Sequence, residues 1–238
     1  MIKTAVSLFY ILISTTAFST VLPNNQHLSN YEATYDVFRN GKVMAEQKTK
    51  VEKSTAQKYT LTDVTTGTKG LAAFTGFKRS ESSNFTSLNA DWVVQKHKMQ
   101  QKVTFSKRNY SFQQNEQSKQ IEGIHKKETF LLNNIQEQPI AAHMLPLRIA
   151  HLACREHKTK FKVTLLKSKK TNTFRFTAST EDNGLIKVAR KYPKKSNKKS
   201  YIWLDPKQQC ITVRSKHIDD DEVIETKLSY LNGAKVAM

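Results

Sequence analysis

The chain has 238 residues, with 39 Lys and Arg against 20 Asp and Glu, which gives a formal net charge of +19. A chain of this length suits one domain with a sizeable core, and its 9% of aromatic residues excludes wholesale disorder. Its two cysteines are too few for a disulfide-built scaffold or a four-cysteine zinc module.

The N-terminal residues have the three-part pattern of a secretory signal peptide. Lys3 is followed by an apolar run from Ala5 to Ile13 and then by small residues. The run is shorter than the ~20 apolar residues that a membrane-spanning helix needs. We therefore expect a signal peptide over residues 1–19, a linker over 20–30, and a mature chain that is exported and soluble.

Beyond residue 30 the hydrophobic pattern alternates, which is typical of half-buried strands. The sequence predicts strands over 31–37, 43–51, 57–66, 91–107 and 110–114. Asn40 and Gly41 have the composition of a type I′ hairpin turn between the first two strands. The Gln- and Asn-rich piece 113–120 is interpreted as a loop or the end of a hairpin.

One segment, residues 139–155, has apolar residues at helical spacing. Pro146 lies inside it, so we expect a broken or two-part helix. Alternating strands follow, over 160–167, 172–179, 184–191, 199–205, 209–217 and 222–230. Sequential strands with one helix indicate a meandering antiparallel sheet, which we expect to form a single domain over 31–232.

Basic charge is concentrated between Lys158 and Lys199, where 14 Lys and Arg meet only Glu181 and Asp182. Such a surface attracts polyanions, and an anionic membrane surface suits an exported protein better than specific nucleic-acid binding does. The alternative interpretation is that strand alternation leaves lysines in water and aromatic residues in the core.

The end of the expected helix carries His151, Cys154 and His157. Zinc accepts these atom types, but the spacing matches no established ligand pattern, so we expect no metal site. Cys154 and Cys210 can form a disulfide in an oxidising compartment, or both can remain buried thiols, and the sequence leaves the two alternatives open.

Motifs of enzyme active sites are absent from the sequence. It contains no G-x-S-x-G, no H-E-x-x-H and no phosphate-binding loop. We therefore expect a protein that is not an enzyme and that holds no cofactor. An enzyme would require two carboxylates brought together in a cleft by the fold.

Several short segments resemble an exported bacterial family, domain of unknown function 3108. They are Tyr31-x-Ala33-x-Tyr35, Arg79-x-Glu81-Ser82, Trp203-Leu204-Asp205-Pro206 and Thr212-Val213-Arg214. The resemblance implies a periplasmic protein of the cell envelope without an established activity. It also implies a mainly β fold similar to periplasmic lipoprotein carriers, in which a curved antiparallel sheet forms an open or half barrel over one main helix.

A curved sheet of this kind suggests two functions. In the first, its concave face binds a lipid-like or amphiphilic ligand, whose anionic head meets lysines and whose entrance is lined by aromatic residues. The residues assigned to this site are Tyr201, Trp203, Lys194, Lys195, Lys198 and Lys199. In the alternative, the basic face docks an envelope protein or an anionic polymer. The sequence does not define the oligomeric state.

Overall fold

The computed structural model describes residues 28–88, 91–115, 117 and 119–236, so the expected signal peptide and most of the expected linker lie outside the described residues. The first half of the chain forms eight strands. They are β1 (Tyr31–Arg39), β2 (Lys42–Lys53), β3 (Lys58–Gly67), β4 (Lys78–Leu88), β5 (Asp91–Val103), β6 (Ser106–Asn115), β7 (Gln120–His125) and β8 (Glu128–Leu132). A short helix, α1 (Gly70–Phe74), connects β3 to β4.

The second half contains the main helical segment and eight more strands. They are β9 (Ile140–Ala141), β10 (Lys160–Lys167), β11 (Lys170–Thr180), β12 (Ile186–Lys191), β13 (Lys199–Asp205), β14 (Ile211–Asp219), β15 (Glu222–Leu231) and β16 (Ala234–Lys235). The helical segment consists of a 3-10 turn (Ala142–Met144), α2 (Leu145–Ala150) and a π-helical turn (His151–Arg155). A second 3-10 turn (Pro206–Gln208) joins β13 to β14.

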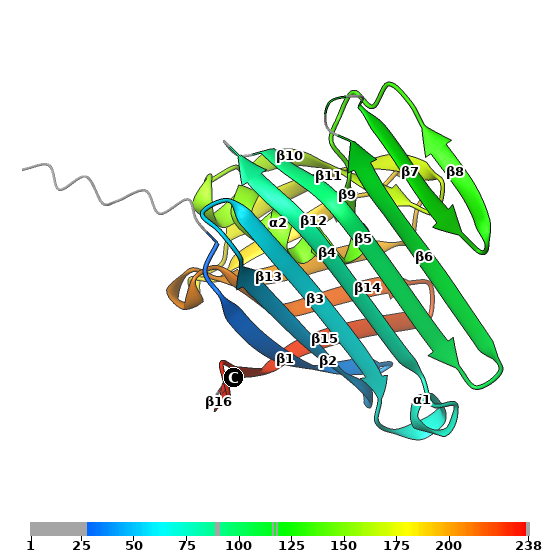
Figure 1. Cartoon of the computed structure of the whole chain (residues 1–238). Coiled ribbons are helices and arrows are strands. Elements are labelled where there is room, and N and C mark those ends of the chain that lie inside the picture. Colours follow the sequence, from blue (N-terminus) through cyan, green and yellow to red (C-terminus); the bar gives the residue numbers. More distant parts are fainter. Residues whose placement is uncertain (1–27, 89–90, 116, 118, 237–238) are drawn as a thin grey trace, which may run out of the picture.

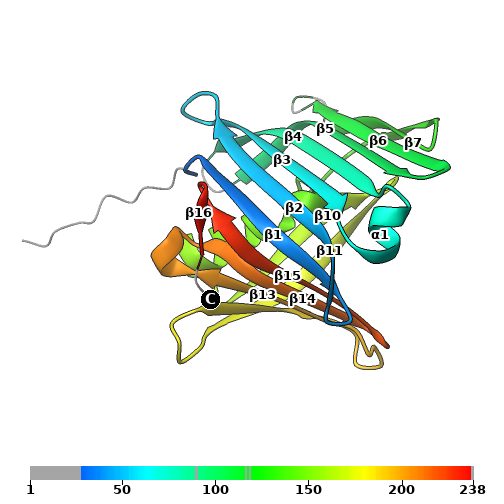
Figure 2. The same ribbon diagram turned by 90° about the horizontal axis from the view of Figure 1, so that it is seen from below.

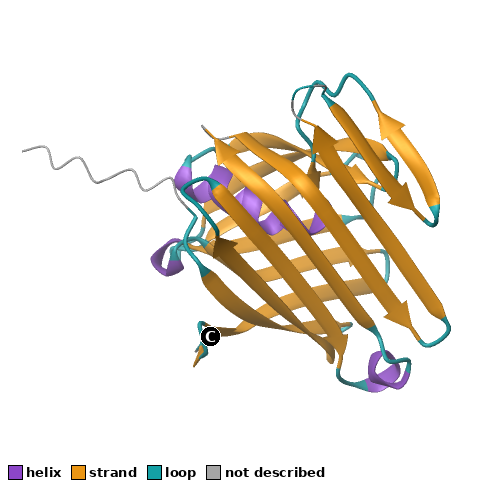
Figure 3. Cartoon of the chain, in the orientation of Figure 1, coloured by secondary structure: helices purple, strands orange, loops and turns teal. Residues whose placement is uncertain are grey.

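All described strands belong to one curved sheet, which is built from two antiparallel meanders (Figures 1 and 2). One meander runs from β1 to β8 and the other from β10 to β15, and the pairing of β1 with β15 joins them. The short β9 pairs in parallel with β10 at the far edge. The helical segment lies between the two halves of the sheet (Figure 3).

The predicted fold class is therefore confirmed: the protein is mainly β, with an open, curved antiparallel sheet and one main helix. Asn40 and Gly41 have φ angles of 49° and 77°, as a type I′ turn requires. The main helix begins at Ala142 and stays helical to Arg155, because Pro146 occupies its first α-helical turn, where no backbone donor is needed.

Five strands were not among the expected elements: β4, β7, β8 and the two-residue strands β9 and β16. The interpretation of 113–120 as a loop or the end of a hairpin is confirmed, since β6 continues to Asn115 and pairs there with Gln120, the first residue of β7. Strand β4 is polar from Lys78 to Asn84, so it lacks the alternating apolar pattern that identifies its neighbours.

The core lies between the concave face of the sheet and the helical segment. Tyr59 stacks on Phe85 with ring centroids 5.5 Å apart, and Phe85 stacks on Trp92 at 4.9 Å. Trp92 in turn contacts His151 of the helical segment. These aromatic residues fill much of the concave face and hold the helix against it. No helix among the described residues has the length and hydropathy of a membrane-spanning segment.

A polar stripe interrupts this core where β2, β3, β4 and β5 lie side by side. Thr49 is the cross-strand partner of Asp63, which is the partner of Glu81. One step along the same strands, Ser83 is the partner of His97. Because cross-strand partners share a face, all five side chains enter the concave side, and all are buried.

Candidate binding cavity

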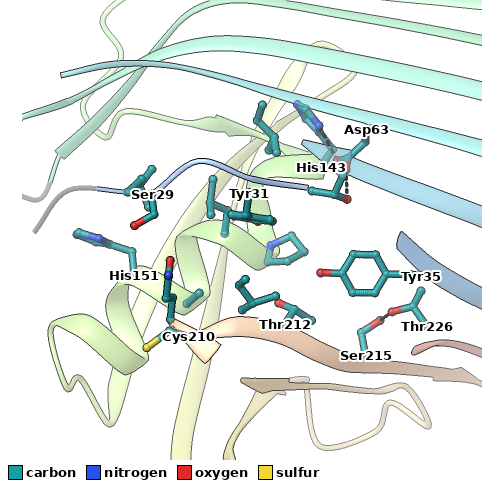
Figure 4. A pocket seen from close by; sticks show the side chains of 18 of the residues that line it. Ser29, Tyr31, Tyr35, Asp63, His143, His151, Cys210, Thr212, Ser215 and Thr226 are labelled. Carbon is teal, nitrogen blue, oxygen red and sulfur yellow. Dashed lines mark hydrogen bonds and ion pairs between the residues drawn. The ribbon is translucent and has the colours of Figure 1, made fainter. Parts of the chain in front are cut away.

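A cavity of about 110 Å³ remains between the helical segment and the sheet (Figure 4). Its wall combines apolar groups from the helix with hydroxyl, amide and carboxylate groups from the strands. Its lining includes Tyr31, Tyr35, Asp63, His143, Ala150 and Ser215. A cavity of about 150 Å³ holds one benzene ring, so this smaller cavity takes at most one ring-sized group and is far too small for a long acyl chain.

A second, wider hollow of about 710 Å³ lies in front of this cavity. We call it the vestibule; it is lined by Leu28, Ser29, Asn30, Lys53, Arg155, Gln209 and Cys210. Five of these residues also line the inner cavity, so the two hollows form one continuous site. Burial lowers the pKa of Arg155, which lies at their junction. Lys53 adds a second cation at the outer rim.

The inner cavity is bordered by a buried Asp–His pair. His143 Nδ1 lies 2.9 Å from Asp63 Oδ2, and the hydroxyl of Thr49 donates to the other carboxylate oxygen. The amide of Gln47 also donates to Asp63. These bonds compensate for the loss of hydration of a carboxylate that is only 7% exposed.

The network continues behind the pair, away from the cavity. Ser83 Oγ lies 2.7 Å from His143 Nε2 and 2.9 Å from His97 Nδ1. A serine hydroxyl has one proton, so it donates to one ring and accepts from the other. Arg79 Nε lies 2.7 Å from Glu81 Oε1, and this ion pair flanks His97 at the end of the stripe.

Asp63, His143 and Ser83 stand in the order of a Ser-His-Asp triad, but Ser83 is placed differently from a nucleophile. Its side chain is fully buried and lies outside the cavity wall. It also contacts a second histidine ring, where a nucleophile would need an approach path for its substrate. The three residues therefore belong to a buried hydrogen-bond network, and His143 and Asp63 are the two of them that line the cavity.

Burial shifts the pKa of several groups around the site. It raises the pKa of Tyr31, and the charge of Asp63 raises it further. Burial is likewise the main cause of the raised pKa of Tyr35. Both phenols are therefore neutral hydroxyl groups near neutral pH, and both can donate hydrogen bonds into the cavity.

The buried histidines shift in the opposite direction. Burial, followed by the charges of His143 and Arg79, lowers the pKa of His97 to about 3. Burial and the charge of Arg148 lower that of His151 to about 4, although Glu156 lies 2.9 Å from its Nε2. Both rings are thus neutral at physiological pH.

The structure joins Cys154 and Cys210 in a disulfide, with their Cα atoms 6.0 Å apart. Of the two alternatives left open by the sequence, the bridge is the one present. It ties the end of the helical segment to the turn before β14, where Gln209 and Cys210 have left-handed φ angles of 55° and 63°. The bridge thereby fixes one wall of both hollows.

Among the described residues, no three His, Cys, Asp or Glu side chains are grouped to hold a metal ion. His151 lies in the wall of the cavity, while His157 is exposed beyond the helix end, and Cys154 is in the disulfide. The three residues weighed as zinc ligands therefore have three different environments.

The residues assigned to ligand binding from the sequence lie outside the cavity. Tyr201 and Trp203 share one face of β13, opposite the core residue Leu204, with ring centroids 5.8 Å apart. Lys187 lies over both rings, and Arg214 lies over Trp203. These cations cover the two aromatic rings on the outer face of the sheet.

The four lysines of the expected binding site lie in and beside the loop between β12 and β13, and all are exposed. Lys198 Nζ lies 2.6 Å from Asp219 Oδ2 in the turn between β14 and β15. Asn197 contacts the neighbouring Asp220. An acidic turn thus lies against part of this basic loop and offsets its charge.

Sequence reasoning did not identify Asp63 and His143 as a pair. The available signal was a carboxylate at an inward position of β3, in line with Tyr59 and Leu61. A charged residue in an apolar row requires a buried partner. The partner comes from the helical segment 80 residues later, so no local motif reveals it.

Comparison with known proteins supports the fold. No family model matches the chain, and no curated protein matches it. A similar solved structure is that of a beta-barrel-like protein of domain of unknown function DUF1849 from Brucella abortus, with a TM-score of 0.53 and 11% sequence identity. The match covers 86% of this chain and 98% of that chain. The resemblance to domain of unknown function 3108 and to lipoprotein carriers stays a prediction.

Proposed function

We propose that the chain is an exported, non-enzymatic binding protein of the cell envelope that takes a compact anionic amphiphile. The observation that carries the proposal is the continuous site formed by the vestibule and the inner cavity, with Arg155 at their junction. An anionic group fits between Arg155 and Lys53, while a ring-sized portion enters between Tyr31, Tyr35 and the helix.

Two features support a binding role over catalysis. The hydroxyl of Ser83 is buried behind His143, away from the space that a substrate would occupy. Apart from Asp63, His143 and Arg155, the cavity wall is made of neutral hydrogen-bonding groups and apolar side chains, which orient a ligand without attacking it. The small inner volume favours a compact group over the long acyl chain of a lipid.

Mass spectrometry of the protein purified without detergent tests the proposal. We expect a bound anionic compound with the wild-type chain, and at least a fivefold lower amount with Arg155→Gln, which removes the cation at the junction. Arg175→Gln changes an exposed arginine on β11 and serves as the matched control. Absence of any co-purifying compound from wild-type protein, or equal loss in both variants, contradicts the proposal.

Export and periplasmic location belong to the same proposal and rest on the sequence pattern of residues 1–19. Peptide mapping of the protein recovered from a bacterial host should find an N-terminus at Thr20 in the periplasmic fraction. An intact N-terminus in cytosolic protein would contradict it.

The alternative function, docking of an envelope protein or anionic polymer, is supported by the exposed loop lysines. Lys194, Lys195 and Lys199 have no ion-pair partner in the described part of the chain. Crosslinking in intact cells separates this function from ligand carriage. Docking predicts one dominant protein adduct that disappears when these lysines are changed to Glu. Ligand carriage predicts that the same variant retains the bound compound.

A further inference from the structure

Three large apolar side chains are exposed together at one end of the sheet. Leu71 and Phe74 of α1 are 73% and 87% exposed, and Phe105 in the turn between β5 and β6 is 100% exposed. The described part of the chain exposes six large hydrophobic residues, and these three are half of them. We call Leu71, Phe74 and Phe105 the apolar tip; Figures 1 and 2 show α1 at this end of the sheet.

The backbone holds the apolar tip in place. Both the amide and the hydroxyl of Thr104 donate to the carbonyl of Thr75 at 2.8 Å, which ties the β5–β6 turn to the end of α1. Gly67 allows α1 to pack on β3, since a Cβ there would lie 2.4 Å from the carbonyl oxygen of Ala72. The exposed side chains thus stand on a fixed support.

A row of lysines borders the apolar tip. Lys78 is the cross-strand partner of Lys102, which is the partner of Lys107. All three are exposed, and they line one shallow hollow of about 280 Å³ together with Ser80 and Asn109. Like charges on directly opposed residues are unfavourable, and within the described residues no carboxylate forms an ion pair with this row.

We propose that this end of the molecule docks on a bilayer surface that contains anionic phospholipid. The apolar tip enters the interface between headgroups and acyl chains, while the lysine row binds lipid phosphate groups in its hollow. The combination of exposed apolar side chains with adjacent cations matches the two attractions that bring proteins to anionic membranes.

Docking through the apolar tip orients the binding site. Strand β3 begins beside the vestibule residue Lys53, the cross-strand partner of Tyr59, and ends at Gly67 beneath α1. Its 10 residues separate the two ends by ~30 Å at ~3.3 Å per residue. A docked molecule therefore turns its vestibule away from the bilayer, toward the aqueous compartment.

Vesicle flotation tests membrane docking independently of any ligand in the cavity. The mature chain should bind phosphatidylcholine vesicles that contain about 30% phosphatidylglycerol, and binding should weaken with added salt. Each lysine near an anionic surface contributes about fivefold in affinity, so Lys102→Gln with Lys107→Gln should lower binding by about 25-fold. Phe74→Ser with Phe105→Ser should lower it by more than tenfold.

Matched controls change the same residue types elsewhere. Leu131→Ser removes an apolar side chain that is 56% exposed on β8, and Lys162→Gln with Lys167→Gln removes two exposed lysines of β10. Both should bind within twofold of wild type. The proposal would be overturned if wild-type protein failed to bind the anionic vesicles, or if the controls lost as much binding as the tip variants. A protein partner would then be the occupant of the apolar tip.

A Phe105→Trp variant provides a second measurement. Its Trp emission should shift to the blue when anionic vesicles are added, because the side chain passes from water into the interface. Circular dichroism of every variant checks that the fold is kept. Emission that stays unchanged while the protein floats with vesicles would show that another surface makes the contact.

Discussion

Asp63 is the residue on which the polar network of the concave face converges. Its carboxylate accepts hydrogen bonds from Thr49, Gln47 and His143, which come from a neighbouring strand and from the helical segment. Because these donors belong to separate elements, the carboxylate fixes the helix against the sheet beside the cavity.

Asp63→Asn tests this function of the carboxylate. The amide lacks the charge and offers a donor where the donors of the network converge, so the free energy of unfolding should fall by about 2–3 kcal/mol. Urea unfolding at neutral pH measures the change. Asp182→Asn, in an exposed turn, should stay within about 0.5 kcal/mol of wild type; a comparable loss there would contradict the role of Asp63.

The buried histidines make stability depend on pH. The pKa of His97 is lowered to about 3, from 6.5 in the unfolded chain. Below pH 6.5 the unfolded state therefore binds more protons than the folded state, and stability is lost as the pH falls toward 3.

Urea unfolding at pH 7 and pH 5 measures this loss. We expect the difference in unfolding free energy between the two pH values to be smaller in His97→Gln than in wild type. In His157→Asn, where the original side chain is exposed, the difference should be unchanged. Equal pH dependence in wild type and His97→Gln would contradict the assignment.

The elements divide into those whose apolar pattern is visible in the sequence and those whose inward face is polar. β1, β3 and β10 alternate clearly and were predicted within a few residues. β4 was missed because its inward positions include Arg79, Glu81 and Ser83, which carry the polar network instead of a hydrophobic row. The site escaped prediction for the same reason: its residues meet only through cross-strand pairing and helix docking.

The helical segment is held at both ends, by His143 at its start and by the disulfide at its end. Replacing Cys154 and Cys210 with Ser removes a bridge between residues 56 apart in the sequence. This change should lower the unfolding free energy by about 2–5 kcal/mol. Reductant should reproduce the loss in wild type and leave the double variant unchanged; a variant as stable as wild type would contradict a structural role of the bridge.

At the scale of the whole molecule, the curved sheet separates three surfaces. The vestibule and inner cavity open at one end of β3, and the apolar tip lies at the other. Trp203 and Tyr201 lie on the outer face under Lys187 and Arg214. The sequence predicted that aromatic residues and lysines gather in the segment around Tyr201 and Trp203. Whether they occupy the concave or the outer face is determined by the curvature of the sheet.

The most direct test of the binding site is an amide NMR titration of the mature chain with phenyl phosphate, a compact anion whose single ring matches the size of the inner cavity. The proposed site predicts the largest shifts around the vestibule and cavity, at Ser29, Arg155, Cys210 and Ser215. Shifts centred instead on the outer face of β13 and its lysine loop, with the vestibule unaffected, would contradict it.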